Sequence, residues 1–115
     1  DLCDKTVLVV RAGFDCGACN ENAPKHQELY AAYRDQGLVV VTLLHDYTQE
    51  IGIDQQNIWA NQYGLEHPVL TDNDQLVSEP LWPDKPGRPM HRLLGPGAVL
   101  LHGDPTHEDV IALFE

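Results

Sequence analysis

A Cys-x-x-Cys motif directly follows a short run of β-branched residues, and this junction constrains the fold more than any other feature. The run covers residues 7–10 and is typical of a buried strand, because consecutive apolar residues stand between polar flanks. We expect Gly13 to end the strand and a helix to cover residues 16–33. Unpaired N–H groups and the helix dipole favour a thiolate at a helix N-terminus. The pair Cys16 and Cys19, one turn apart, therefore predicts dithiol–disulfide exchange.

Composition narrows the classes of partner. The chain has 115 residues and a formal net charge of −11, from 18 acidic and 7 basic side chains. Without a basic run, neither nucleic acid nor an anionic membrane surface is an expected partner. No segment approaches the roughly 20 apolar residues that cross a bilayer. We expect one domain over 1–115, and because a core strand starts so early, we expect it to be trimmed at its N-terminus.

The rest of the chain alternates between strand and helix patterns. Further strands are predicted over 38–44, 67–72, 90–94 and 98–102. A helix is predicted between Asp54, as its cap, and Gly64, and a last helix from Thr106. A Pro/Gly-rich loop is expected over 79–89. A right-handed βαβ unit makes the first two strands parallel, and the whole pattern predicts an α/β fold, a mixed sheet with helices on both faces.

Several features together resemble the thioredoxin-fold redoxins of the TlpA/ResA-like (AhpC/TSA-like) group. The features are the Cys16-Gly17-Ala18-Cys19 motif with Pro24, the stretch 59–72 and Pro89 with the strand behind it. The resemblance implies a thioredoxin-like fold, with Cys16 as nucleophile and Cys19 as resolving thiol. It further implies that Pro89 is a cis-proline packed against the disulfide, shaping a groove for an extended substrate.

The same resemblance implies the surroundings in which the dithiol works. Its partners are protein disulfides or dithiols and an upstream thiol electron donor, and no cofactor is expected. The implied location is extracytoplasmic and bacterial, either periplasmic or tethered to the membrane. The residues between the cysteines, Gly17 and Ala18, are candidates for the substrate groove and for tuning the thiol pKa, but they do not fix a reduction potential.

The chain departs from the family pattern near the motif. Asp15 stands where the family usually has Trp, and a carboxylate there raises the pKa of Cys16. Val10 replaces a buried acid, and Asn22 replaces a Glu that helps to deprotonate the second cysteine. Arg88, before the expected cis-proline, can offset Asp15 or bind an acidic substrate. The alternative for Arg88 is an exposed side chain in a Pro-rich loop.

Histidines and the third cysteine carry weaker signals. The chain has six histidines: His26, His45, His67, His91, His102 and His107. No His-x-x-x-His or second cysteine pair accompanies them, so no metal centre is expected. His67 and His91 flank the expected active-site elements. Cys3 is expected to be half-buried and too far from Cys16 to exchange with it.

Two alternatives to an oxidoreductase stay open at this stage. Asp15, Val10 and Asn22 are compatible with a non-catalytic thioredoxin-like module that binds a partner or a metal. A peroxiredoxin-type thiol peroxidase is less consistent with the sequence. That chemistry needs a peroxide-binding Thr three residues before the cysteine, where this chain has Gly13.

Overall fold

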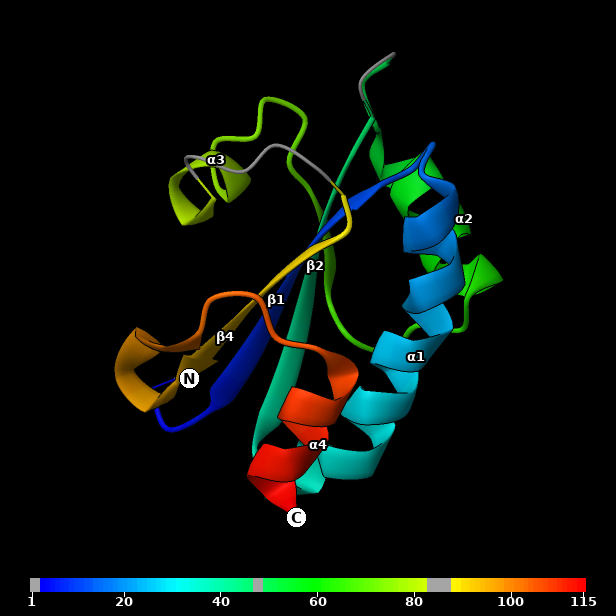
Figure 1. Cartoon of the computed structure of the whole chain (residues 1–115). Helices are drawn as coiled ribbons and strands as arrows, with labels where there is room; N and C mark the ends of the chain where they lie inside the picture. Colours follow the sequence, from blue (N-terminus) through cyan, green and yellow to red (C-terminus); the bar gives the residue numbers. More distant parts are fainter. Residues whose placement is uncertain (1–2, 47–48, 83–87) are drawn as a thin grey trace.

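A five-stranded sheet with the strand order β3-β2-β1-β4-β5 forms the centre of the molecule (Figure 1). The computed structural model describes residues 3–46, 49–82 and 88–115. The strands are β1 (Thr6–Gly13), β2 (Leu38–His45), β3 (Val69–Thr71), β4 (Met90–Gly95) and β5 (Val99–His102). The helices are α1 (Gly17–Tyr33), α2 (Ile53–Gln62), α3 (Ser78–Leu81) and α4 (His107–Phe114). Short 3₁₀ turns cover Arg34–Gln36 and Pro96–Ala98.

Strand direction decides which chain segments meet at each edge of the sheet. β1 pairs in parallel with β2 in a continuous register from Thr6 opposite Leu38 to Gly13 opposite His45. β3 is also parallel to β2, whereas β4 is antiparallel to β1 and β5 to β4. The carboxyl ends of β1 and β2 therefore lie beside the start of β4. The predicted mixed α/β sheet is confirmed, and its topology brings the cysteine motif close to residues 88 and 89.

The two faces of the sheet are covered unequally. Because side chains alternate along a strand, Leu8, Val10 and Ala12 of β1 face one cluster, while Val9 faces another. The first cluster contains residues of α1, α2 and α4, and the second contains Trp82 at the end of α3. Figure 1 shows α1, α2 and α4 on one side of the sheet and α3 on the other. The prediction of helices on both faces is confirmed.

Several predicted boundaries were wrong, and the strand expected over 67–72 covers only Val69–Thr71. The N-cap residue of α2 is Gly52, whose N–H donates a hydrogen bond to Gln55 Oε1 at 2.6 Å. Asp54, expected to be the cap, therefore lies inside the first turn. The stretch expected as a loop from residue 79 starts within the short helix α3, and residues 83–87 of it lie outside the described residues. Within the described part of the chain, no helix has the length and apolarity required to cross a lipid bilayer.

Candidate active site

The two cysteines of the motif form a disulfide at the start of α1. Cys16 is the N-cap residue of this helix, and its Sγ accepts a hydrogen bond from the Cys19 N–H at 3.2 Å. The Cα atoms of the pair are 5.2 Å apart. Cys19 Sγ accepts a further hydrogen bond from the Gly13 N–H at 3.4 Å. Backbone donors thus reach both sulfurs, which stabilises negative charge there when the pair is reduced.

Solvent exposure separates the two sulfurs chemically. Cys19 is 1% exposed and belongs to the core cluster, whereas Cys16 is only half-buried. Gly17 and Ala18 between them are exposed. An external disulfide can therefore approach Cys16 over these two small residues, while Cys19 is reached only from Cys16.

The Arg88–Pro89 segment lies alongside the end of β1. Met90 pairs with Arg11 in antiparallel register, so Arg88 and Pro89, which precede Met90, lie beside the end of β1. The peptide bond between Arg88 and Pro89 is cis. A side chain added at Gly13 would overlap the Arg88 guanidinium, so that group lies directly over this glycine.

Arg88 forms an ion pair with Asp15. Arg88 Nη1 lies 2.5 Å from Asp15 Oδ1, and the Arg88 side chain is only 12% exposed. The interpretation of Arg88 as an exposed loop residue was therefore wrong. The pair places a guanidinium next to the carboxylate that precedes Cys16, so the two charges largely offset one another at the sulfur.

His45 also lies at this edge of the sheet, and sequence reasoning missed it. It is the last residue of β2, opposite Gly13, and its carbonyl accepts a hydrogen bond from the Phe14 N–H at 2.8 Å. Burial, together with the charges of Arg88 and Arg11, lowers the pKa of His45 below its ordinary value. A neutral imidazole is thus held close to the motif. The signal available in the sequence was its place directly after the strand predicted over 38–44.

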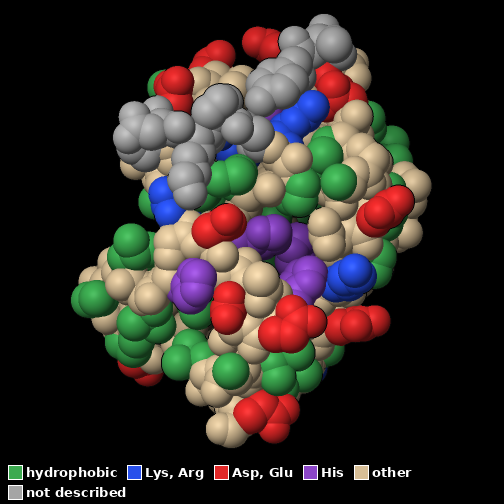
Figure 2. Space-filling model, viewed as in Figure 1, with side chains coloured by type: hydrophobic (Ala, Val, Ile, Leu, Met, Phe, Trp, Pro, Cys, Tyr) green, Lys and Arg blue, Asp and Glu red, His purple; other side chains and the backbone are tan. Residues whose placement is uncertain are grey.

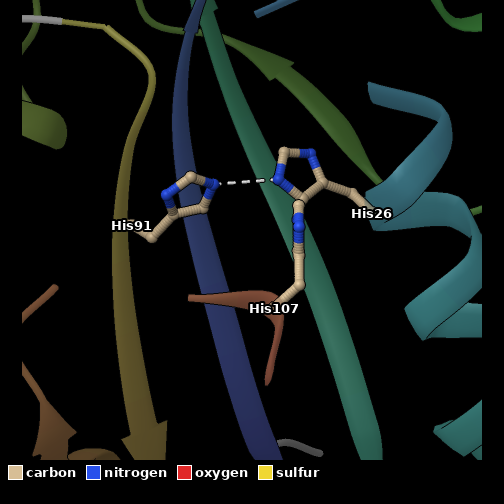
Figure 3. A group of neighbouring side chains, drawn as sticks. All are labelled: His26, His91 and His107. Atoms are coloured by element: carbon tan, nitrogen blue, oxygen red, sulfur yellow. Dashed lines mark hydrogen bonds between the residues drawn. The ribbon is translucent and has the colours of Figure 1, made fainter. Parts of the chain in front are cut away.

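The structure also shows the surroundings of the third cysteine and of the two histidines expected to flank the active site. His67 is buried, and its Nε2 lies 3.2 Å from Thr42 Oγ1. Cys3 is exposed, not half-buried as expected, and takes no part in the disulfide. His91 instead joins His26 and His107 in a compact group that no sequence spacing indicated (Figure 3).

A mixed sheet of this topology, with a Cys-x-x-Cys disulfide at the helix that follows its central strand, defines a thioredoxin-fold protein. The chain belongs to the redoxin family, whose sequence model matches residues 3–81. It is 34% identical over 77 residues to the thiol-disulfide oxidoreductase ResA of Bacillus thuringiensis (strain Al Hakam), and equally to ResA of Bacillus anthracis. The match covers 67% of this chain and 42% of each ResA. This chain thus spans less than half the length of these relatives.

Solved structures support the same fold. A putative thioredoxin from Neisseria meningitidis superposes with a TM-score of 0.80 at 20% identity, covering 98% of this chain and 74% of that one. A putative thiol:disulfide interchange protein DsbE from Chlorobium tepidum gives a TM-score of 0.76 at 22% identity, covering 99% and 78%. At these identities the likeness concerns the fold.

Proposed function

We propose that the chain is a thiol-disulfide oxidoreductase in which Cys16 is the nucleophile and Cys19 the resolving thiol. The observation that carries this proposal is the unequal exposure of two bonded sulfurs at a helix N-terminus. The similarity to ResA supports the same chemistry. A thiol peroxidase and a non-catalytic module that binds a partner or a metal are less favoured, because the first lacks a Thr at residue 13 and the second needs no accessible sulfur.

The reaction proceeds by two thiolate attacks. In the reduced protein, the Cys16 thiolate attacks one sulfur of a substrate disulfide, forming a mixed disulfide and releasing the first substrate thiolate. The Cys19 thiolate then attacks Cys16 Sγ, which closes the disulfide seen in the structure and releases the second substrate thiolate. Two electrons pass to the substrate, and an external thiol donor must return them. Reversed, the same steps oxidise a substrate dithiol.

The surroundings of Cys16 suit an extended protein substrate. The exposed Gly17 and Ala18 leave space beside Cys16, and Arg88 of the cis-proline segment contacts Asp15, the residue that precedes Cys16. We infer that the backbone before Pro89 pairs with the substrate strand and orients its disulfide. We also infer a bacterial extracytoplasmic location, periplasmic or membrane-tethered. The TlpA/ResA-like resemblance supports it, and one structural neighbour is a secreted disulfide oxidoreductase of Mycobacterium tuberculosis.

Single-cysteine variants test the assignment of roles. In a Cys3→Ser background, reduced Cys19→Ser should accumulate a mixed disulfide with a disulfide-bonded peptide, because nothing resolves it. Cys16→Ser should form at least about a hundredfold less, since its remaining thiol is buried. Mass spectrometry of the trapped species gives the yields. Equal trapping by both variants, or trapping only through Cys19, would overturn the assignment.

The reduction potential shows the direction of electron flow. Equilibration in dithiol or glutathione buffers, followed by alkylation and mass measurement, should give a reversible two-electron titration. A value near −250 mV or lower indicates a reductant, whereas about −120 to −180 mV indicates an oxidant or isomerase. A pair that does not titrate reversibly would contradict the oxidoreductase proposal.

A further inference from the structure

Three histidines from separate elements meet on the face of the sheet that α1 and α4 cover. His26 belongs to α1, His91 to β4, and His107 is the first residue of α4. One ring nitrogen from each lies within 4.8 Å of those of the other two. Figure 3 shows the rings turned toward one another, with His26 Nε2 and His91 Nε2 2.9 Å apart. The three imidazoles thus surround one small volume.

Each histidine is positioned by a different local constraint. His91 is paired with Val10, and directly opposed residues share a face, so its ring points toward α1. His26 lies on the buried side of α1, in line with Cys19 and Ala23. His107 is fixed where α4 begins, because the Thr106 hydroxyl accepts from the Asp109 N–H and the Asp109 carboxylate accepts from the Thr106 N–H. The backbone therefore holds all three before any ligand arrives.

Among the described residues, hydrogen bonds do not provide a partner for every buried ring nitrogen of the three histidines. His26 is 3% exposed, and burial of polar nitrogens costs free energy unless each finds a partner. The His26–His91 contact uses one nitrogen of each ring, and His107 Nε2 is buried without a hydrogen-bond partner in the described part of the chain. Burial, then the neighbouring histidines, lowers the pKa of His26 to about 2, so its imidazole stays neutral. Neutral imidazole is the form that binds a metal.

We propose that His26, His91 and His107 form a binding site for a borderline divalent metal ion, with Zn²⁺ as the ion that fits best. Zn²⁺ binds imidazole nitrogen at about 2.0–2.1 Å, so three tetrahedral ligand atoms lie roughly 3.3 Å from one another. His26 Nε2 and His91 Nε2, 2.9 Å apart, would have to separate by a few tenths of an ångström, and one ring nitrogen of each histidine already lies within 4.8 Å of the others. Three protein ligands leave a fourth position for water.

The surface around the group favours access by a cation. Figure 2 shows histidine side chains reaching the surface near the centre of the view, with several acidic side chains below them and a basic side chain beside them. Asp104, Glu28 and Glu108 all lie close enough to act electrostatically on His91 or His107, and Lys25 opposes them. The net charge of −11 adds to the attraction of a dication.

The proposed site does not depend on the thiols. His26 lies seven residues beyond Cys19, about 10 Å along the helix axis at 1.5 Å per residue. The metal should therefore bind while the disulfide is intact and no thiolate can act as a ligand. This separates the metal site from the proposed redox function, so either can fail without the other.

Metal titration of the oxidised Cys3→Ser protein tests the site. Calorimetry with Zn²⁺ alone should show one equivalent bound, and Co²⁺ should give visible absorption bands typical of four-coordinate nitrogen and oxygen ligands. His91→Gln and His107→Gln should each weaken binding by at least about tenfold, the lower limit for losing even an outer-shell partner of a metal site. His102→Gln serves as the matched control, since His102 is an exposed histidine outside the group and its removal should leave affinity unchanged.

A folding control accompanies the titration, and three outcomes would contradict the proposed metal site. Circular dichroism and the urea unfolding midpoint without metal should be the same in the His107→Gln variant as in its parent, so that lost binding cannot reflect lost folding. Absence of Zn²⁺ and Co²⁺ binding by the folded parent would overturn the proposal. So would affinity that persists in both cluster variants or falls as much in His102→Gln.

Discussion

At the scale of single residues, the Asp15–Arg88 pair controls the charge next to Cys16. An ion pair this close to solvent contributes at most about 1 kcal/mol to folding stability. Its effect on the sulfur is more important, since a lone carboxylate beside Cys16 disfavours the thiolate and a lone guanidinium favours it. The two residues should thus act in opposite directions on reactivity while changing stability little.

Variants of this pair should shift the pH dependence of Cys16 alkylation. In reduced Cys3→Ser protein, Arg88→Gln leaves the Asp15 carboxylate uncompensated and should raise the pH midpoint by about half a unit to one unit. Asp15→Asn should lower it by a similar amount. Glutamine keeps most of the volume of arginine, so access to the sulfur changes little. The rate of iodoacetamide labelling between pH 4 and 9 gives the midpoint.

The double variant is the internal control for this effect. If the residues act through their charges, Asp15→Asn with Arg88→Gln should return the midpoint close to that of the parent. A double variant that is no closer to the parent than either single variant would show that Arg88 acts by covering Gly13 instead.

Another residue-scale prediction concerns His67. Burial lowers its pKa from 6.5 to about 4 in the folded protein, whereas the unfolded chain titrates near 6.5. Between these values the unfolded state binds more protons, so the stability contributed by neutral His67 is complete above about pH 6.5 and falls on acidification toward pH 4. The free energy of unfolding should decline by up to about 1.4 kcal/mol per pH unit from this group.

Urea denaturation at pH 7.0 and 5.5, with a chelator present, measures the slope. His67→Gln keeps a hydrogen-bonding partner for Thr42 and removes the titration, so its stability should vary less with pH than that of the parent. Identical slopes would mean that His67 titrates near its unfolded value in the folded protein.

At the scale of elements, local sequence patterns predicted helix ends that depend on residue type, and they missed a helix that depends on tertiary packing. The start of α4 was readable because the Thr106 and Asp109 side chains are typical helix-capping acceptors, and Gly37, with φ of 97°, ends the 3₁₀ turn in a left-handed conformation that glycine favours. The helix α3 was not readable, since four residues that include Pro80 have no helical period. It is held by packing of the adjoining Trp82 against Val9 and Leu43.

Loss of Trp82 should therefore expose the second face of the sheet. This side chain is 1% exposed and is the largest fully buried one described. Trp82→Ala should lower the free energy of unfolding by about 3–5 kcal/mol. Leu76→Ala, at a nearby residue that is 76% exposed, should stay within about 0.5 kcal/mol of the parent. Chemical denaturation of both variants makes the comparison, and equal losses would mean that α3 does not anchor this face.

At the scale of the whole molecule, the sequence predicted the sheet and the dithiol but not which distant side chains meet. The parallel pairing of the first two strands followed from the βαβ rule, and Cys16 and Cys19 lie in one helical turn. His26 and His91 are 65 residues apart, and only the assembled sheet brings their nitrogens to 2.9 Å. Arg88 and Asp15, 73 residues apart, also meet through the sheet, and it was the family resemblance, not their spacing, that suggested Arg88 could offset Asp15. Local spacing carries no information about such pairs.

Net charge also acts at this largest scale, and it should sort substrates by their charge. The chain has a formal net charge of −11 and a Cα radius of gyration of 13.3 Å. At 0.01 M salt the screening length is about 30 Å, which exceeds that radius, so charges from the whole molecule contribute to the potential at Cys16. At 0.15 M salt the screening length is about 8 Å, and only nearby charges contribute. A cationic disulfide should then react faster at low salt, and an anionic one more slowly.

Stopped-flow oxidation of the reduced Cys3→Ser protein by three small disulfides tests this expectation. The rate with cystamine, a dication, should fall severalfold as salt rises from 0.01 to 0.15 M, and the rate with dithiodipropionate, a dianion, should rise by a comparable factor. Hydroxyethyl disulfide is neutral and should show little change, which controls for effects of salt on the thiolate itself. Salt dependences of the same sign for all three disulfides would mean that salt acts on the Cys16 thiolate itself, and that the net charge does not sort substrates by their charge. In that case the acidic surface would serve solubility alone, and substrate choice would depend on contacts beside Pro89.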